Sequence, residues 1–286
     1  MMGRIYFGPA GNSLSFAAEG HKSVLEVPAW LDKRGLNAFE YQCGRGVNIG
    51  RDKAEQLGAL AREHGIRLSI HAPYYISMSS VDEEKRLNSV NYILQSCEAA
   101  EGMGADRIIF HSGSAGKIER REAMGLALDT MRRILQAVDE NGYSGITLCP
   151  ETMGKVNQLG SLEEVIELCS ADERLIPCID FGHLNARSGG GIKTSSDYKM
   201  IFDMLERGVG KERTRLFHGH FSKIEYSKGG EVRHLTFEDS VFGPDFNLCA
   251  EIIAERGYTP VLICESDGVQ AEDAAEMMRI YGRFLK

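Results

Sequence analysis

The sequence predicts an α/β protein that forms a single (β/α)8 barrel, the TIM-barrel architecture, over residues 1–286. Short apolar runs alternate with longer segments of helical periodicity eight times along the chain. The runs are rich in Ile, Leu, Val and Phe without regular polar alternation, which is typical of parallel strands buried on both faces. The sequence contains no Pro- or Ser-rich linker that would divide it, and barrels often reach this length as one domain.

The strands are predicted from the apolar runs in the order in which they occur. Each run is short enough for a strand and too short for a typical helix. The eight predicted strands cover residues 4–8, 37–41, 67–71, 106–111, 145–151, 175–180, 214–220 and 260–265.

The helices are predicted from apolar residues that recur on one helical face. In residues 53–64 this stripe ends before Gly65, a residue that commonly terminates helices. Ser161 and Glu164 form a capping box that opens another helix. A doubly wound open sheet is the alternative architecture, but no G-x-G-x-x-G motif follows the first strand. The other predicted helices cover residues 83–103, 121–141, 196–207, 245–256 and 271–285.

Composition narrows the classes of protein that fit. A formal net charge of -8 disfavours a general nucleic-acid coat protein, although it leaves room for a local basic rim around a cleft. The seven cysteines form no C-x-x-C pair, which argues against a disulfide scaffold and a thiolate zinc site. With no signal-like or membrane-spanning apolar stretch, we expect a cytoplasmic protein, and we expect it to act as a monomer.

Ligand-type side chains gather at the ends of the predicted strands. In a (β/α)8 barrel the carboxyl ends of all strands open onto one rim, where active sites form. Residues distant in sequence would therefore converge there. Nine side chains at or just after strand ends have this character: His71, His111, Glu151, Asp180, His183, His218, His220, His234 and Glu265.

These residue types predict a metal centre with more than one ion. Imidazole and carboxylate donors without thiolate suit zinc, manganese or iron. A single buried histidine is more often an ordinary core residue, but six successive strands with such endings indicate a site. Nine donors exceed the needs of one catalytic zinc, and clusters of two or three ions commonly hydrolyse phosphodiesters. His21 and His64 lie outside the pattern, and we assign them no role.

The segments that carry these donors resemble the endonuclease IV family, the zinc-dependent apurinic/apyrimidinic endonucleases within the xylose-isomerase-like barrels. The order and spacing of the donors are specific, whereas any single segment is not. The resemblance covers nearly all of the predicted barrel. It rests on residues 71–75 (HAPYY), 110–113 (FHSG), 150–152 (PET), 180–183 (DFGH), 218–223 (HGHFSK), 231–234 (EVRH) and 264–265 (CE).

The resemblance implies two or three zinc ions, with manganese as another possible metal, and double-stranded DNA containing abasic sites as the substrate. In that family the phosphodiester 5′ to the baseless sugar is cleaved. One zinc would be held by His71 and His111, and Glu151 would bridge it to a second, making Glu151 the key catalytic residue. The remaining implied metal ligands are Asp180, His218 and Glu265 for the second zinc, and His183 and His234 for the third.

The resemblance also implies substrate contacts. Tyr74 matches an aromatic residue beside the lesion pocket, and Arg45 and Lys223 are candidate phosphate contacts. Each of these two cations is equally compatible with an ordinary solvated charge.

Two departures from the family pattern concern the third metal and the loop after the second strand. The family has an Asp-x-His pair where this chain has Val232 before His234, so either the neighbouring Glu231 substitutes through a shifted loop or the third metal is weak or absent. The compact loop 42–48 retains little of the family's polar DNA-reading loop. His220 is left unassigned, as a ligand or as a partner that supports one.

The main alternative is a sugar isomerase or epimerase of the same fold. Such enzymes share the four-donor core that Glu151, Asp180, His218 and Glu265 would form, usually around manganese, cobalt or magnesium. The additional histidines favour the nuclease, because an epimerase with one metal does not require them. A barrel that has lost catalysis and serves only for binding would be expected to have more broken ligand positions.

Overall fold

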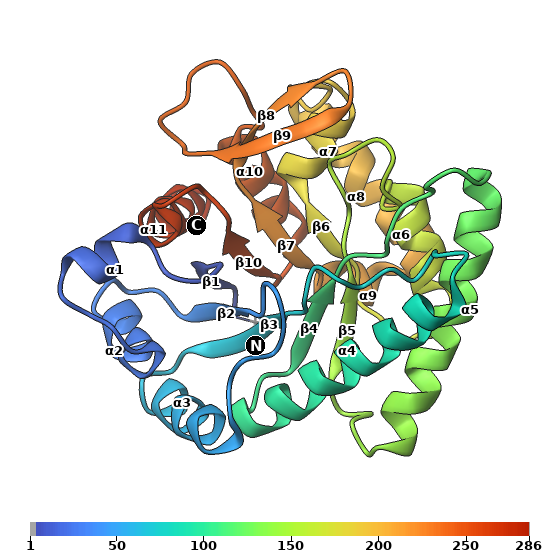
Figure 1. The fold of residues 1–286 in the computed structure, drawn as a ribbon. Coiled ribbons are helices and arrows are strands. Elements are labelled where there is room, and N and C mark those ends of the chain that lie inside the picture. The colour runs from blue at the N-terminus through green and yellow to red at the C-terminus, as the bar shows by residue number, and fades with distance from the viewer. Residues whose placement is uncertain (1–3, 286) are drawn as a thin grey trace.

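Eight parallel strands form the closed barrel that the sequence predicts (Figure 1). The computed structural model describes residues 4–285. One half of the barrel has the strand order β2-β3-β4-β5 and the other β1-β10-β7-β6, and single parallel bridges, Ala10 to Glu40 and Glu151 to Cys178, join the halves. The barrel strands are β1 (Tyr6–Pro9), β2 (Ala38–Gln42), β3 (Arg67–His71), β4 (Arg107–Phe110), β5 (Thr147–Pro150), β6 (Cys178–Asp180), β7 (His218–Phe221) and β10 (Val261–Cys264).

Helices surround this barrel, and the longer ones follow the predicted segments closely. The helix predicted over 53–64 runs from Arg51 to Glu63, and Ser161 and Glu164 form both hydrogen bonds of the predicted capping box. The main helices are α3 (Arg51–Glu63), α4 (Glu83–Met103), α5 (Arg120–Glu140), α6 (Leu162–Cys169), α8 (Ser195–Val209), α10 (Phe246–Arg256) and α11 (Gln270–Gly282).

Several short elements were not predicted, because each contains only one or two turns. They are α1 (Leu14–Ala18), the 3-10 helix η1 (Val24–Glu26), α2 (Val27–Asp32), α7 (Phe181–Arg187) and α9 (Lys211–Arg215). An antiparallel hairpin was also missed. Its strands, β8 (Lys223–Ser227) and β9 (Gly230–Leu235), lie between β7 and α10 and stand beyond the carboxyl ends of the barrel strands (Figure 1).

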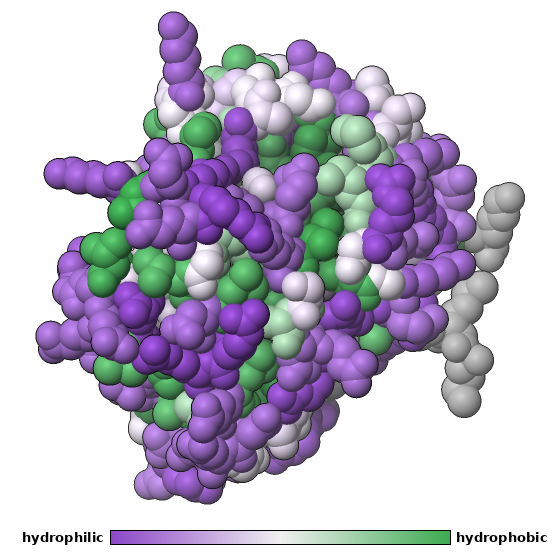
Figure 2. Space-filling view, turned by 90° about the vertical axis from the view of Figure 1, so that its right-hand side faces the viewer, coloured by the Kyte–Doolittle hydropathy of each residue, from purple (hydrophilic) through white to green (hydrophobic). Residues whose placement is uncertain are grey.

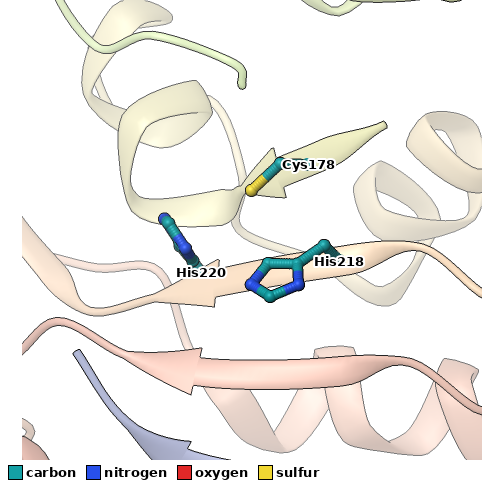
Figure 3. Close-up of side chains that lie close together, drawn as sticks. All are labelled: Cys178, His218 and His220. Atoms are coloured by element: carbon teal, nitrogen blue, oxygen red, sulfur yellow. The ribbon is translucent and has the colours of Figure 1, made fainter. Parts of the chain in front are cut away.

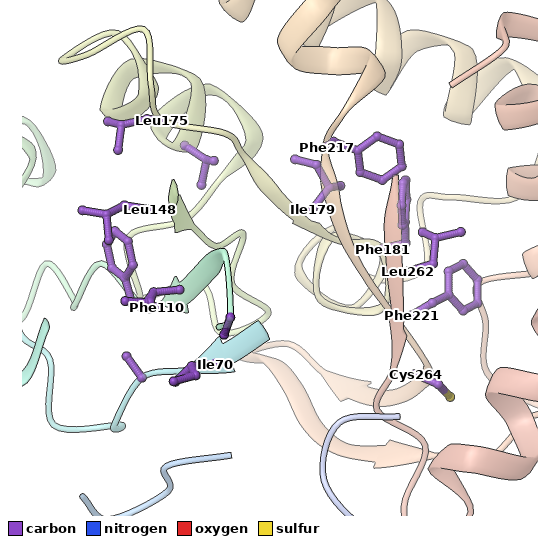
Figure 4. Close-up of a cluster of buried hydrophobic side chains, with 14 of the residues drawn as sticks. Ile70, Phe110, Leu148, Leu175, Ile179, Phe181, Phe217, Phe221, Leu262 and Cys264 are labelled. Carbon is purple, nitrogen blue, oxygen red and sulfur yellow. The ribbon is translucent and has the colours of Figure 1, made fainter. Parts of the chain in front are cut away.

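The hydrophobic core lies mainly between the strands and the helices. Phe217, just before β7, and Phe221 of β7 pack with Phe181 of α7, and Leu262 of β10 belongs to the same cluster (Figure 4). All seven cysteines are buried and unpaired. The face that carries α5 and α6 is largely hydrophilic (Figure 2). Among residues 4–285, no helix is both long and apolar enough to cross a membrane.

β1 passes close to β2 at Gly8. A Cβ atom added to Gly8 would lie 1.9 Å from the carbonyl oxygen of Ala38, which is far inside contact distance. Because that oxygen belongs to a buried strand, it cannot move aside without separating the two strands. Glycine at this position is therefore a requirement of barrel closure.

We predict that Gly8→Ala destabilises the protein by about 2–3 kcal/mol, the usual cost of overpacking a core, and lowers Tm by roughly 5 °C or more. Thermal unfolding followed by circular dichroism measures this effect. Gly145→Ala is the matched control, since its added methyl group meets open space and should leave Tm nearly unchanged. Equal Tm values for the two variants would contradict the packing argument.

Candidate metal centre

Residues 4–285 contain four groups of potential metal donors. One group, Cys178, His218 and His220, lies deeper in the barrel on β6 and β7, and nine side chains at the carboxyl-end rim form the other three. Within each group, one donor atom from every member lies within 4.8 Å of the others. Glu151 belongs to two of the rim groups and so connects them. The three rim groups are His71, His111 and Glu151; Glu151, Asp180, His220 and Glu265; and His183, Glu231 and His234.

Glu151 lies at the middle of this arrangement, at the carboxyl end of β5. Its Oε2 atom is 3.2 Å from Nε2 of both His71 and His111. Its Oε1 atom is 3.0 Å from Nδ1 of His220 and 3.4 Å from Nδ1 of His183. The carboxylate is almost fully buried. Each oxygen thus faces a different pair of imidazoles, which is an arrangement suited to bridging two cations.

Asp180 contributes an oxygen that has no partner of its own. As the N-cap of α7, its Oδ1 atom accepts a hydrogen bond from the backbone N–H of His183 at 2.7 Å. Its Oδ2 atom is buried without a hydrogen-bond partner and lies 3.3 Å from Nδ1 of His183. A buried carboxylate oxygen normally has a partner, so this atom fits the role of a metal donor.

The hairpin β8–β9 supplies the rest of the third group. Glu231 Oε2 lies 3.4 Å from Nε2 of His183, and His234 Nδ1 lies 2.8 Å from the hydroxyl of Ser222. Gly154 permits this approach, since a Cβ atom there would lie 2.6 Å from Cβ of Glu231. Val232 is half exposed. Glu231 therefore lies beside His183 and His234, and its role as a metal ligand stays a prediction.

His218 lies outside the group to which the sequence analysis assigned it, and His220 takes that place. Strand register explains the difference: Asp180 pairs with His220, whereas Cys178 pairs with His218 two residues deeper in the barrel. Two residues of strand correspond to roughly 6–7 Å. Figure 3 shows both histidines on β7 with Cys178 facing them from β6. Nε2 of His218 instead lies 2.9 Å from Oε2 of Glu40.

The acids of the three groups have no Lys or Arg to balance them. Among residues 4–285, their only ion-pair partners within 4 Å are histidines. Burial acts to raise the pKa of Glu151, but His220 and the other contacting histidines outweigh it and hold that pKa well below the usual range. Burial raises the pKa of Glu265. Bound cations would balance this concentration of carboxylates.

The donor set and the overall architecture can be compared with known proteins. The sequence pattern of the xylose isomerase-like TIM barrels matches residues 28–281, which is most of the chain. The chain belongs to the xylose isomerase-like TIM barrel family.

Two relatives of the chain illustrate its similarity to known sequences. An uncharacterized protein from Methanocaldococcus jannaschii is 33% identical over 279 residues, covering 97% of each chain. The probable endonuclease 4 of Shouchella clausii is 25% identical over 220 residues, covering 73% of each.

Two solved structures also resemble the chain. Endonuclease IV from Thermus thermophilus superposes with a TM-score of 0.66 at 20% identity, over 99% of this chain and 98% of that one. A D-tagatose 3-epimerase-like protein gives 0.71 at 19% identity, over 98% and 97%. These two likenesses establish the fold, which does not by itself determine the reaction.

The three candidate substrate contacts on this xylose isomerase-like barrel differ in their exposure and in their hydrogen bonds. Tyr74 is 56% exposed, with its ring centroid 5.8 Å from those of His71 and His111. Arg45 is exposed in the turn after β2, and the backbone N–H of Tyr74 donates to the carbonyl of its neighbour Gly44. The Tyr74 ring therefore borders the centre, and the turn that carries Arg45 lies next to Tyr74.

Lys223 differs from the other two candidates. Its ammonium group donates to the backbone carbonyls of Phe237, at 2.8 Å, and Asp239. These bonds hold the loop that follows the hairpin, so the structure places Lys223 in a loop-anchoring position rather than free at the mouth.

We predict that metal binding at pH 7 releases about one proton or more per chain, because metal ligands must be deprotonated. Burial lowers the pKa of His183, but Asp180, Glu151 and Glu231 outweigh it and raise that pKa to about 10. His183 is thus protonated at pH 7 in the metal-free protein, and its contribution to proton release should disappear as the pH rises through about 10. Zinc titration calorimetry in buffers of different ionisation enthalpy measures the release. A heat independent of buffer would contradict the prediction.

Proposed function

We propose that this protein is a metal-dependent phosphodiesterase that cleaves duplex DNA 5′ to abasic sites, as in base excision repair. The observation that carries the proposal is that three donor groups adjoin one another: two of them share Glu151, and the third includes His183, whose Nδ1 atom lies 3.4 Å from Oε1 of Glu151. A sugar epimerase with one metal requires only Glu151, Asp180, His220 and Glu265. The other five donors in the three groups would then have no function at the rim of the barrel.

The residues fit zinc, and manganese is compatible with the same donors. His71, His111 and Glu151 would hold one ion, and His183, Glu231 and His234 another. Glu151, Asp180, His220 and Glu265 together would hold a third ion. When bound, such ions supply positive charge for a phosphate and increase the acidity of water.

Side chains around the centre support a DNA substrate. The exposed ring of Tyr74 offers an apolar face at the edge of the donor groups. Arg45 is exposed on the adjoining turn and, among residues 4–285, forms no ion pair, so its guanidinium is available to a phosphate. Binding through such contacts should weaken with salt, because phosphate contacts release counterions. Curated relatives of the chain named probable endonuclease 4 point in the same direction.

A sugar isomerase or epimerase is the second candidate. The specific observation in its favour is that Glu151, Asp180, His220 and Glu265 form a self-sufficient group of four donors. A protein described as D-tagatose 3-epimerase-like has the same barrel fold. The two candidates differ in the number of ions they need and in their substrates.

We predict that the zinc-loaded protein incises a duplex oligonucleotide at a synthetic abasic site and that Glu151→Gln lowers the rate on the order of a thousandfold or more. Each tenfold loss corresponds to about 1.4 kcal/mol, and a lost metal contribution amounts to several kcal/mol. Gel analysis of labelled DNA measures the rate and identifies the cleaved bond.

Glu255→Gln is the matched control, because Glu255 is exposed on α10 and its one ion-pair partner among residues 4–285 is Lys199. It should incise DNA at the rate of the unmodified protein. Intact abasic DNA after incubation with the zinc-loaded protein, together with epimerisation of a ketose, would reverse the order of the two candidates.

A further inference from the structure

We propose that Glu40 is a positioning residue that orients His220 toward the metal centre from beneath. The inference rests on the metal centre of the proposed function and extends it to a residue that the sequence analysis did not single out. Glu40 lies on β2 with its carboxylate fully buried inside the barrel. It belongs to none of the three donor groups.

The carboxylate of Glu40 is placed between the two histidines of β7. Its Oε1 atom is 3.0 Å from Nε2 of His220, and its Oε2 atom is 2.9 Å from Nε2 of His218. Ser69 donates its hydroxyl to Oε2 at 3.0 Å, and Gln42 donates its amide to Oε1 at 3.1 Å. Among residues 4–285, no Lys or Arg forms an ion pair with it. Its charge is therefore directed at the histidines.

The two nitrogens of His220 face different partners. Nδ1 lies 3.0 Å from Glu151 and 3.6 Å from Glu265, so it is the atom that would coordinate a cation in that group. A neutral imidazole that coordinates through Nδ1 carries its proton on Nε2. That buried N–H needs an acceptor, and Oε1 of Glu40 is within reach.

The two ring nitrogens of His220 differ in their hydrogen-bond alignment. In this structure Nδ1 of His220 is aligned with Glu151, whereas Nε2 has no aligned partner despite its 3.0 Å distance from Glu40. With Nδ1 as the coordinating atom, the ring proton would be on Nε2, which lies 3.0 Å from Oε1 of Glu40. A carboxylate that accepts the second ring N–H of a histidine ligand fixes the tautomer of the histidine and increases the basicity of its coordinating nitrogen.

A purely structural role does not account for Glu40. Burying a carboxylate is costly unless its charge is used, and an apolar side chain would fill the same space at lower cost. His218, on the other carboxylate oxygen, is fully buried and holds Glu40 from the opposite side. Glu40 is thus fixed in position to act on His220.

The test measures zinc affinity of the full chain by competition with a chromogenic chelator, together with the absorption spectrum of the cobalt-substituted protein. Glu40→Gln should weaken binding at the site that contains His220 by about 10- to 100-fold and shift the cobalt spectrum. Glu255→Gln is the matched control, since Glu255 is an exposed acid of α10 that belongs to no donor group, and it should change the affinity less than about threefold. Unchanged affinity and spectrum in Glu40→Gln would overturn the proposal.

A double-mutant cycle shows whether Glu40 acts through His220. In a His220→Asn background, Glu40→Gln should have little further effect on zinc affinity, whereas a full additional loss would overturn the proposal. If Glu40→Gln fails to fold, Glu40→Asp replaces it in the same cycle. The aspartate keeps the negative charge, but its shorter side chain moves the carboxylate oxygens away from His220.

Two further outcomes are distinguishable. A separate equivalent of zinc that is lost in both Glu40→Gln and Cys178→Ser would make Glu40 a direct ligand and overturn the positioning role. Glu40→Gln could weaken zinc binding while the unmodified protein fails to incise DNA. That pair of results would support the positioning role of Glu40 and refute the proposed function.

Discussion

The carboxylate of Glu151 is the constraint on which the rest of the site depends. It is buried at the end of β5, and its two oxygens face four imidazoles at 3.0 to 3.4 Å. Nearby acids add negative charge. Among residues 4–285, the only side chains that form ion pairs with these acids are histidines. Histidine donors and unbalanced carboxylates at such separations match a site for several divalent cations.

The barrel makes this concentration of charge possible. Six of the eight parallel strands, β3 to β7 and β10, each place one ligand-type residue at the same rim, so most of the centre forms without a long loop. The exception is the third group, which depends on the hairpin β8–β9. Gly154 lets that hairpin approach closely enough for Glu231 to meet His183. Beneath the rim, Glu40 extends the polar site into the barrel interior.

Much of this arrangement could be predicted from the sequence, because it follows from strand order and hydrophobic pattern. The eight strands, the long helices and the residues at strand ends all depend on periodicity. The choice between His218 and His220 depends on register between neighbouring strands, which periodicity does not report. Pairing of Asp180 with His220 decides it. The short α7 begins at a cap, Asp180, that the sequence presents only as a ligand.

Contacts between distant segments were the least predictable. Lys223 is a cation close to the site in sequence. Its hydrogen bonds to the carbonyls of Phe237 and Asp239 depend on where the chain runs after the β8–β9 hairpin. Glu40 left a detectable signal, as an acidic residue within an otherwise largely apolar strand. Such a residue in a barrel strand points either to an ion pair or to a site, and here it lies against two histidines.

An anomalous difference map at the zinc absorption edge, from crystals of the zinc-loaded protein, tests the central claim most directly. The account predicts separate peaks on the two sides of Glu151, each within coordination distance of one of its oxygens, and a further peak among His183, Glu231 and His234. A single peak bound by Glu151, Asp180, His220 and Glu265 alone, with His71 and His111 uncoordinated, would contradict it.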